Sequence, residues 1–133
     1  MIYFLRNKQP LYVLSGRIVH GRGIGKKAGM PTANLEIIKD MIIPELGVYA
    51  SKVKLGNREY TGVTNVGLRP TVDNDKDITI ETYILDFDGD IYEEKIELEL
   101  FVLLRGQQKF EDMSMLRKQL HKDCIEAKKY FGA

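Results

Sequence analysis

The sequence predicts a mainly β protein, an antiparallel barrel with one helix packed on its outside or across one end. Several short stretches rich in β-branched and aromatic residues are separated by turn signals, which is typical of short strands joined by hairpins. No part of the chain alternates strand with helix, so a parallel doubly wound sheet is disfavoured. The helical pattern comes only after these strands, near the C-terminus.

The composition is that of one globular domain. The chain has 133 residues, of which 44% are hydrophobic and 29% charged. The net charge of +1 provides no global attraction for nucleic acid or an anionic membrane. The single cysteine, Cys124, excludes an intramolecular disulfide and fits a reducing cytoplasm. With no secretory signal and no apolar run near the ~20 residues that span a bilayer, we expect a cytoplasmic protein.

The first half of the chain predicts three strands. Residues 11–20 are rich in Val, Ile, Leu and Tyr, and a loop over 21–34 follows them. Residues 48–55 and 58–64 flank Gly56-Asn57, a dipeptide that favours a hairpin.

The second half predicts two further strands and the helix. Arg69-Pro70 interrupts the pattern, and a strand over 78–87 follows and ends at a tight turn, Asp88-Gly89. The strand over 95–104 alternates strictly. Its apolar face carries Ile96, Leu98, Leu100, Val102 and Leu104.

Beyond Phe110 the period changes to that of an amphipathic helix over 113–131. Either Asp112 or Ser114 can serve as its N-cap. The apolar stripe consists of Leu116, Leu120, Cys124, Ala127 and Phe131.

The loop over 21–34 contains candidate anion-binding and metal-binding residues. Glycines and lysines in 21–30 can approach and neutralise an anion, and Pro31-Thr32-Ala33-Asn34 follows. Thr32 and Asn34 offer neutral oxygen ligands, which suit a Mg²⁺ ion that arrives with a polyphosphate. Two alternatives stay open at this point: a surface loop with two lysines, and a proline turn whose side chains bond their own backbone.

Glu81 is a candidate general base. Alternation over 78–87 places it on one face with Thr79 and Tyr83, and both faces of the strand are largely apolar. Carboxylates are rarely buried without a partner, and desolvation would raise the pKa of Glu81 towards neutrality. That shift would suit a base, although a glutamate at a barrel mouth paired with a lysine or arginine fits the same pattern.

These segments, in this order and spacing, resemble the riboflavin kinase domain, which also forms the C-terminal half of bacterial bifunctional riboflavin kinase/FAD synthetases. The resemblance runs from about Ser15 to Tyr130. The matching segments are 16–21 (GRIVHG), 29–35 (GMPTANL), 47–50 (GVYA), 62–67 (GVTNVG), 69–71 (RPT), 81–87 (ETYILDF) and Leu104-Arg105 with Lys109-Phe110.

The resemblance implies a six-stranded antiparallel Greek-key barrel. It also implies transfer of the γ-phosphoryl group of ATP to the 5′-hydroxyl of riboflavin, giving FMN. In this resemblance Glu81 is the catalytic base. Thr32 and Asn34 hold a divalent metal, Mg²⁺ or another cation such as Zn²⁺ or Mn²⁺, together with the nucleotide phosphates.

The resemblance assigns the remaining site residues to two groups. Those expected to contact the nucleotide, besides Thr32 and Asn34, are Gly21, Lys26, Ile84, Asp86 and Tyr92. Those expected to contact the flavin are Arg105 and Phe110. Gln107 departs from the family, which usually carries Glu there, and we expect the lost charge to leave Arg105 less well positioned.

The resemblance also implies a domain organisation. Residues 1–133 form a single kinase domain, in which 1–10 are a connector or a ragged end. We expect a monomer that binds ATP/ADP and riboflavin/FMN, with no nucleic-acid or membrane partner. It is either a stand-alone kinase or a domain excised from a fusion with an adenylyltransferase domain, and we expect it not to make FAD. The alternative function is a catalytically weak regulatory module of the same fold that binds flavin or FMN.

Overall fold

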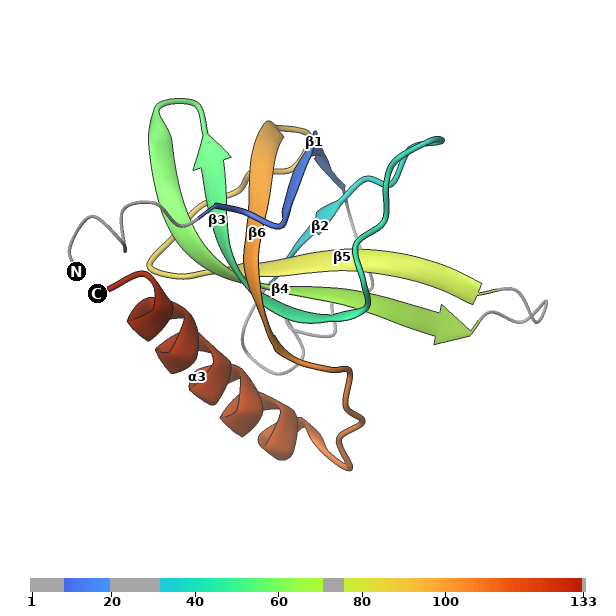
Figure 1. The fold of residues 1–133 in the computed structure, drawn as a ribbon, viewed down its shortest axis with the longest axis vertical. Coiled ribbons are helices and arrows are strands. Elements are labelled where there is room, and N and C mark those ends of the chain that lie inside the picture. The colour runs from blue at the N-terminus through green and yellow to red at the C-terminus, as the bar shows by residue number, and fades with distance from the viewer. Residues whose placement is uncertain (1–8, 20–31, 71–75, 133) are drawn as a thin grey trace.

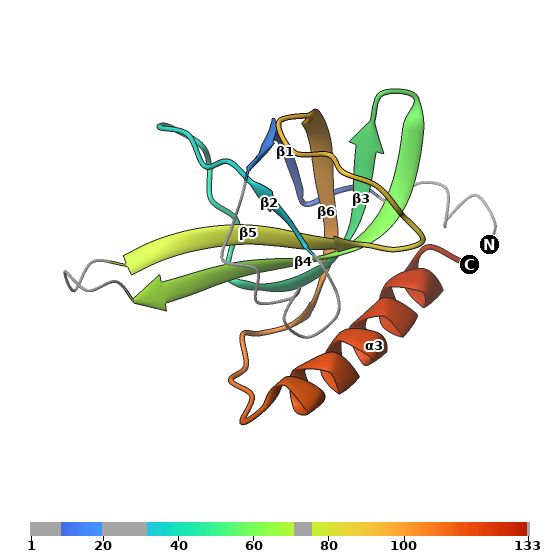
Figure 2. The same cartoon turned by 180° about the vertical axis from the view of Figure 1, so that it is seen from behind.

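The computed structural model describes residues 9–19, 32–70 and 76–132, with only the backbone at 69–70 and 76–77. These residues form a closed antiparallel barrel with the strand order β1-β2-β5-β4-β3-β6 (Figures 1 and 2). The predicted six-stranded barrel is therefore confirmed. Its strands are β1 (Tyr12–Val19), β2 (Ala33–Leu35), β3 (Gly47–Leu55), β4 (Arg58–Pro70), β5 (Lys76–Ile84) and β6 (Lys95–Arg105).

The strand order is that of a Greek key. β3, β4 and β5 are successive neighbours, and β6 returns by a longer connection to lie beside β3. This corrects the prediction of a tight turn at Asp88-Gly89. β6 pairs with β1 and β3 rather than with β5, and residues 85–94 connect the two strands across the barrel.

Three predicted boundaries are also wrong. The strand predicted over 78–87 is β5, which ends at Ile84. β4 continues through Arg69-Pro70, where the sequence indicated a break, because its backbone pairs with β5 as far as Pro70. β2 occupies Ala33–Leu35 and so overlaps the end of the predicted loop over 21–34. This short strand closes the barrel between β1 and β5, so that Asn34 has a fixed position opposite Glu81.

The barrel interior is the main hydrophobic core. It is filled by inward-facing side chains from every strand, among them Ile18, Leu35, Tyr49, Ile80 and Leu98. Close to these lie three buried hydroxyl groups. Thr64 Oγ1 donates to Ser51 Oγ at 2.8 Å and lies 2.8 Å from Thr82 Oγ1. These bonds link β3, β4 and β5 directly beneath the outer face that carries the candidate site.

A second, smaller core lies between the outside of the barrel and α3 (Met113–Tyr130). It includes Val48, Ala50, Val63 and Ala127, and α3 packs across β3 and β4 (Figure 1). The predicted helix and its position outside the barrel are confirmed. No helix in the described part of the chain is both long enough and apolar enough to span a membrane.

The apolar residues of β6 are divided between the two cores. The sequence predicted one continuous face from Ile96 to Leu104. Instead, the register of β6 against β3 shifts twice, between Val48 and Tyr49 and between Ala50 and Ser51. Each irregularity adds a residue to β6 and reverses the alternation. Leu104 therefore packs against the core under α3, whereas Ile96 lies inside the barrel.

The N-terminus of α3 is capped as the sequence predicted. Of the two candidates, Asp112 is the N-cap, and its Oδ1 accepts a hydrogen bond from the Met115 backbone N–H at 2.9 Å. The apolar stripe faces the barrel, with Ala127 fully buried and Cys124 half-buried. Burial raises the pKa of the Cys124 thiol to about 11.

Candidate active site

Five residues form one row across the outside of the barrel. In the strand register, Asn34 of β2 pairs with Glu81 of β5, and Glu81 pairs in turn with Asn65 of β4. Asn65 pairs with Val48 of β3, and Val48 with Arg105 of β6. Directly paired residues of antiparallel strands project from the same face of the sheet. The row therefore places the predicted base, one predicted metal ligand and one predicted flavin contact on one surface.

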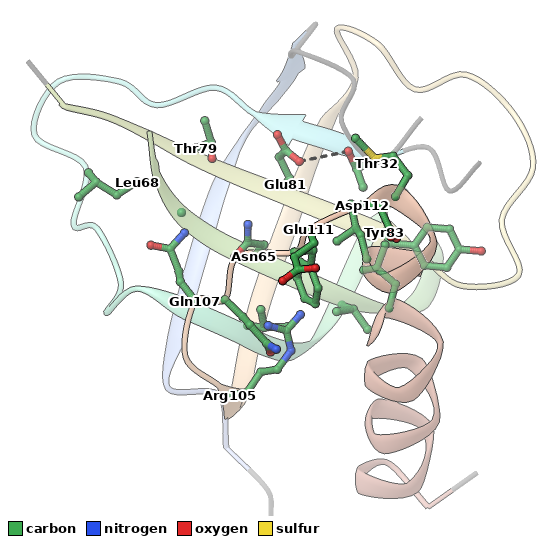
Figure 3. A pocket seen from close by; sticks show the side chains of 18 residues that line it. Thr32, Asn65, Leu68, Thr79, Glu81, Tyr83, Arg105, Gln107, Glu111 and Asp112 are labelled. Atoms are coloured by element: carbon green, nitrogen blue, oxygen red, sulfur yellow. Dashed lines mark hydrogen bonds between the residues drawn. The ribbon is translucent and has the colours of Figure 1, made fainter. Parts of the chain in front are cut away.

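A pocket covers most of this row (Figure 3). Its volume is about 740 Å³, within the usual range for small-molecule sites. Its walls come from β3, β4, β5, the end of β6, residues 107–112 and the first half of α3. The pocket thus lies between the barrel and the N-terminal half of the helix, with Thr32 and Glu81 towards one end and Arg105 towards the other.

Thr32 and Glu81 lie together at the β2–β5 end of the pocket. Thr32 Oγ1 donates to Glu81 Oε2 at 3.5 Å, and both side chains are partly buried (Figure 3). Asn34, 9% exposed, occupies the neighbouring register position on β2. Two neutral oxygen-bearing side chains and one carboxylate are therefore grouped where the sequence predicted a base beside a metal site.

The donor set at this end fits a hard divalent cation that brings other ligands with it. Hydroxyl, amide and carboxylate oxygens are the protein ligands that Mg²⁺ prefers. Among the described residues there is no cluster of three or more His, Cys, Asp or Glu side chains able to hold a metal. An ion bound by Thr32 and Asn34 would thus need further oxygen ligands, such as phosphate oxygens and water.

The opposite end of the pocket is built around Arg105. Its guanidinium is held by Asp123 of α3: Nε donates to Oδ1 at 3.0 Å and Nη2 donates to Oδ2 at 2.9 Å. The Arg105 Cζ atom lies 5.7 Å from the centre of the Phe110 ring, within the range of a cation–π contact. The two predicted flavin contacts, Arg105 and Phe110, are therefore brought together and both line the pocket.

Arg105 has an acid partner other than residue 107, because Asp123 supplies a paired carboxylate. The expected effect of Gln107 on the position of Arg105 and on flavin binding stays a prediction. The Gln107 side chain lies elsewhere. Its Nε2, the Asn65 Nδ2 and the Thr79 Oγ1 all lie within 3.3 Å of the point where a side chain at Gly67 would begin.

Of the predicted nucleotide contacts that the structure describes, Thr32 lines this pocket, whereas Asn34, Ile84, Asp86 and Tyr92 do not. Gly21 and Lys26 lie outside the described residues. Ile84 belongs to the barrel interior, and its side chain is 8% exposed. Asp86 lies 3.9 Å from Lys128, near the C-terminal end of α3, and Tyr92 is an exposed residue of the β5–β6 connection. Their contact with a nucleotide remains a prediction.

Sequence reasoning missed Asp123 and Asn65. Asn65 lies in a segment that carried the family resemblance, but its position beside Glu81 depends on the β4–β5 register. Asp123 had a sequence signal. It follows Leu120 by three residues and precedes Ala127 by four, so the helical period places this acid in the apolar stripe. Glu81 was singled out because a carboxylate on an apolar face is rarely buried without a partner, and the same holds for Asp123.

Comparison with known proteins identifies the family. The family model described as riboflavin kinase matches residues 8–131. A bifunctional riboflavin kinase/FMN adenylyltransferase of Listeria monocytogenes is 36% identical over 121 residues, which cover 91% of this chain and 38% of that protein. The chain thus spans well under half the length of this relative.

Two solved structures are similar to the fold. One, named as a macrolide-efflux protein from Streptococcus pneumoniae, has a TM-score of 0.80 and 32% identity over 90% of this chain and 38% of that one. The other, riboflavin kinase from Trypanosoma brucei, has a TM-score of 0.64 and 23% identity over 92% of this chain and 80% of that one. At that identity, the second supports the fold alone.

Proposed function

Because the chain belongs to the riboflavin kinase family, we propose that it transfers the γ-phosphoryl group of ATP to the 5′-hydroxyl of riboflavin, producing FMN and ADP. The observation that carries this proposal is the row across the barrel. It places Glu81 between Asn34 and Asn65, with the Thr32 hydroxyl 3.5 Å from its carboxylate, inside a pocket of about 740 Å³.

Glu81 is the proposed general base. Phosphoryl transfer depends mainly on alignment and charge neutralisation, with one residue to accept the proton of the attacking hydroxyl. The Glu81 carboxylate projects into the pocket from a strand that is paired on both sides, by β2 and by β4. A residue fixed in this way holds its carboxylate in a constant position relative to a bound alcohol.

Thr32 and Asn34 are the proposed protein ligands of the metal that accompanies ATP. A bound divalent cation, Mg²⁺ or a similar ion, would neutralise negative charge on the phosphates during transfer. Thr32 and Asn34 contribute oxygen donors beside Glu81, and Gly21 and Lys26, earlier in the sequence, are further proposed nucleotide contacts. The neutral Thr and Asn add no negative charge to that of the carboxylates that line the pocket, Glu81, Glu111 and Asp112.

Arg105 and Phe110 are the proposed flavin contacts. A flavin ring system is planar, with an apolar face and an edge of carbonyl oxygens and ring nitrogens. The Phe110 ring offers an aromatic surface, and Arg105 offers N–H donors in the same plane as its guanidinium. Arg105 is at the opposite end of the row from Asn34, so a flavin held there would direct its ribityl chain towards Glu81.

We also infer that the enzyme is cytoplasmic and that its partners are the small molecules ATP and riboflavin. The sequence favours no nucleic-acid or membrane partner.

The test of the kinase activity is incubation of the purified chain with riboflavin, ATP and Mg²⁺, followed by chromatographic separation of flavins. The proposal expects FMN to form in proportion to enzyme concentration and to require the metal. Tight flavin binding without any FMN would instead support the regulatory module.

A further inference from the structure

Asp123 is a buried charge in the middle of α3. Its exposed fraction is 3%, and it is the one ionisable residue among the buried polar residues of the described ranges. Aspartate is almost never fully buried unless it is paired, because transfer of its charge out of water is costly. In the apolar stripe of the helix, the Asp123 carboxylate therefore needs a paired group, and its presence there suggests a role for that pair.

The partner is Arg105, and the pair is bidentate. Nε donates to Oδ1 at 3.0 Å and Nη2 donates to Oδ2 at 2.9 Å, so one edge of the guanidinium is matched to the whole carboxylate. Gln119, one turn earlier on α3, donates from Nε2 to Asp123 Oδ1 at 3.0 Å. Asp123 is thus held by donors from two side chains and cannot rotate away from Arg105 without breaking the bidentate pair.

This arrangement determines which part of Arg105 faces the pocket. The Nε–Nη2 edge is engaged by Asp123, and Nη1 donates to the exposed carbonyl of Gly106 at 3.3 Å. The Arg105 side chain is 19% exposed and lines the pocket, whereas the Asp123 side chain is 4% exposed and does not. The carboxylate therefore lies behind the arginine, on the side away from a ligand.

We propose that Asp123 is a positioning residue for flavin binding, which acts through Arg105. By holding the Nε–Nη2 edge, it directs the Nη1 end of the guanidinium towards the acceptor edge of the flavin ring and keeps Arg105 over Phe110. Asp123 also neutralises the arginine, so that a neutral ring can bind beside it. This inference rests on the proposed function and extends it to a residue that lies outside the pocket lining.

The test compares Asp123→Asn with the unmodified chain in steady-state kinetics and in flavin-fluorescence binding titrations. The Asn side chain keeps the size of Asp but removes the charge and one of the two acceptors that Arg105 uses. We expect the KM for riboflavin to rise by about tenfold, with kcat and the KM for ATP changed little, because an interaction common to bound substrate and transition state is weakened. Glu126→Gln is the matched control, since Glu126 is an exposed carboxylate of the same helix whose ion pair with Lys129 is 4.0 Å long.

A double variant, Arg105→Gln with Asp123→Asn, separates positioning from stability. Asp123→Asn leaves Arg105 without its counter-charge, and that alone can lower the melting temperature. In the double variant no charge is left unpaired, so the melting temperature should recover relative to Asp123→Asn. Riboflavin affinity should stay low, because the directed donor is gone.

The outcomes distinguish this inference from the proposed function. Suppose that the unmodified chain makes FMN. If Asp123→Asn has the same riboflavin KM as the unmodified chain, or if the double variant recovers that KM, Asp123 is merely structural. If the unmodified chain makes no FMN, the kinase proposal fails, and the fluorescence titration alone decides. Weaker flavin binding in both variants, but not in Glu126→Gln, would still support the positioning role.

Discussion

At one end of the pocket the polar groups come from neighbouring strands, and at the other they come from a strand and a helix. Asn34, Glu81 and Asn65 are consecutive members of one register row, so backbone pairing alone fixes their spacing. Arg105 depends on Asp123, 18 residues later, and on how α3 docks against β3 and β4. The positions of the polar groups at the first end are therefore fixed by the barrel backbone. The position of Arg105 at the second end depends also on the contact between α3 and the barrel.

This difference matches the demands of the two substrates in the proposed reaction. Phosphoryl transfer needs an accurately placed base and metal ligands, and strand pairing supplies that accuracy. A flavin ring needs a surface that can admit and release it, and the second end is formed partly by residues 107–112, several of which are exposed. Variants at the two ends should therefore affect different kinetic parameters, and the following predictions test that separation.

We call the end of the pocket with Thr32 and Glu81 the strand-built end, and the end with Arg105 the helix-built end. The largest effect is expected for Glu81→Gln at the strand-built end. Removal of a general base typically lowers the rate by about 10²–10⁴-fold, and the amide retains the size of the side chain. We expect kcat to fall by this amount while the affinities for ATP and riboflavin change little. FMN formation under saturating substrates is the measurement.

Glu97→Gln is the control for this variant. Glu97 is also a strand glutamate, but it lies on β6, 3.6 Å from Lys54 Nζ and away from the pocket. Its substitution should leave kcat unchanged. Near-normal turnover by Glu81→Gln would remove Glu81 from the role of base.

Thr32→Val should give the next largest effect. Valine keeps the branched shape of threonine but lacks the hydroxyl that donates to Glu81 at 3.5 Å and that is the proposed metal ligand. We expect the KM for Mg-ATP to rise by about tenfold, since one oxygen ligand is lost, while the riboflavin KM stays constant. Thr61→Val is the control, because the Thr61 hydroxyl accepts a bond from Lys52 outside the pocket. A rise in the riboflavin KM instead would contradict the assignment of this end to the nucleotide.

Sequence reasoning singled out Thr32, Asn34 and Glu81 at the strand-built end. Residue type and alternation made them candidates, the family resemblance assigned their roles, and those roles stay predictions. Asn65 was not singled out, because only the strand order tells which residue lies opposite Glu81. Strand order is a long-range property: the predicted turn at Asp88-Gly89 failed because β6 pairs with β3 rather than with its predecessor.

The helix-built end was predicted in outline but without its main contact. The amphipathic period correctly gave α3 and the face that meets the barrel, and the N-cap, Asp112, was one of two candidates. The contact between Arg105 and Asp123 depends on the docking of that face, which periodicity does not specify. The irregularities in β6 were also invisible in the sequence, because alternation continued through them to Leu104.

Gly62→Ala tests how tightly the side chains inside the barrel are packed. A Cβ atom at Gly62 would lie 2.8 Å from both Ser51 Oγ and Thr82 Cγ2, which belong to residues with no more than 2% exposure. Overpacking of a core typically costs about 1–3 kcal/mol. We expect a loss of unfolding free energy of that size, measured by urea denaturation.

Gly67→Ala is the matched comparison on the same strand. Its Cβ would lie 3.0 Å from Gln107 Nε2 and 3.2 Å from Asn65 Nδ2, the ends of two side chains that line the pocket. Because such ends can move, the stability loss should be smaller than for Gly62→Ala, and the methyl group should mainly weaken ligand binding. The reverse order of stabilities would show that the pocket wall, rather than the interior, is the tighter packing.

The smallest effect is expected for Asp112→Ala at the start of α3. The substitution removes the acceptor of the Met115 N–H, and loss of an N-cap typically costs about 0.5–2 kcal/mol. Ser114→Ala is the control, because Ser114 is exposed within the first turn and should change stability by less than about 0.5 kcal/mol. Asp112 also lines the pocket and follows the segment that carries Phe110, so loosening of this turn should raise the riboflavin KM while leaving the KM for ATP unchanged. A change in the KM for ATP of equal size would mean that the two ends are not independent, and that the docking of α3 controls both.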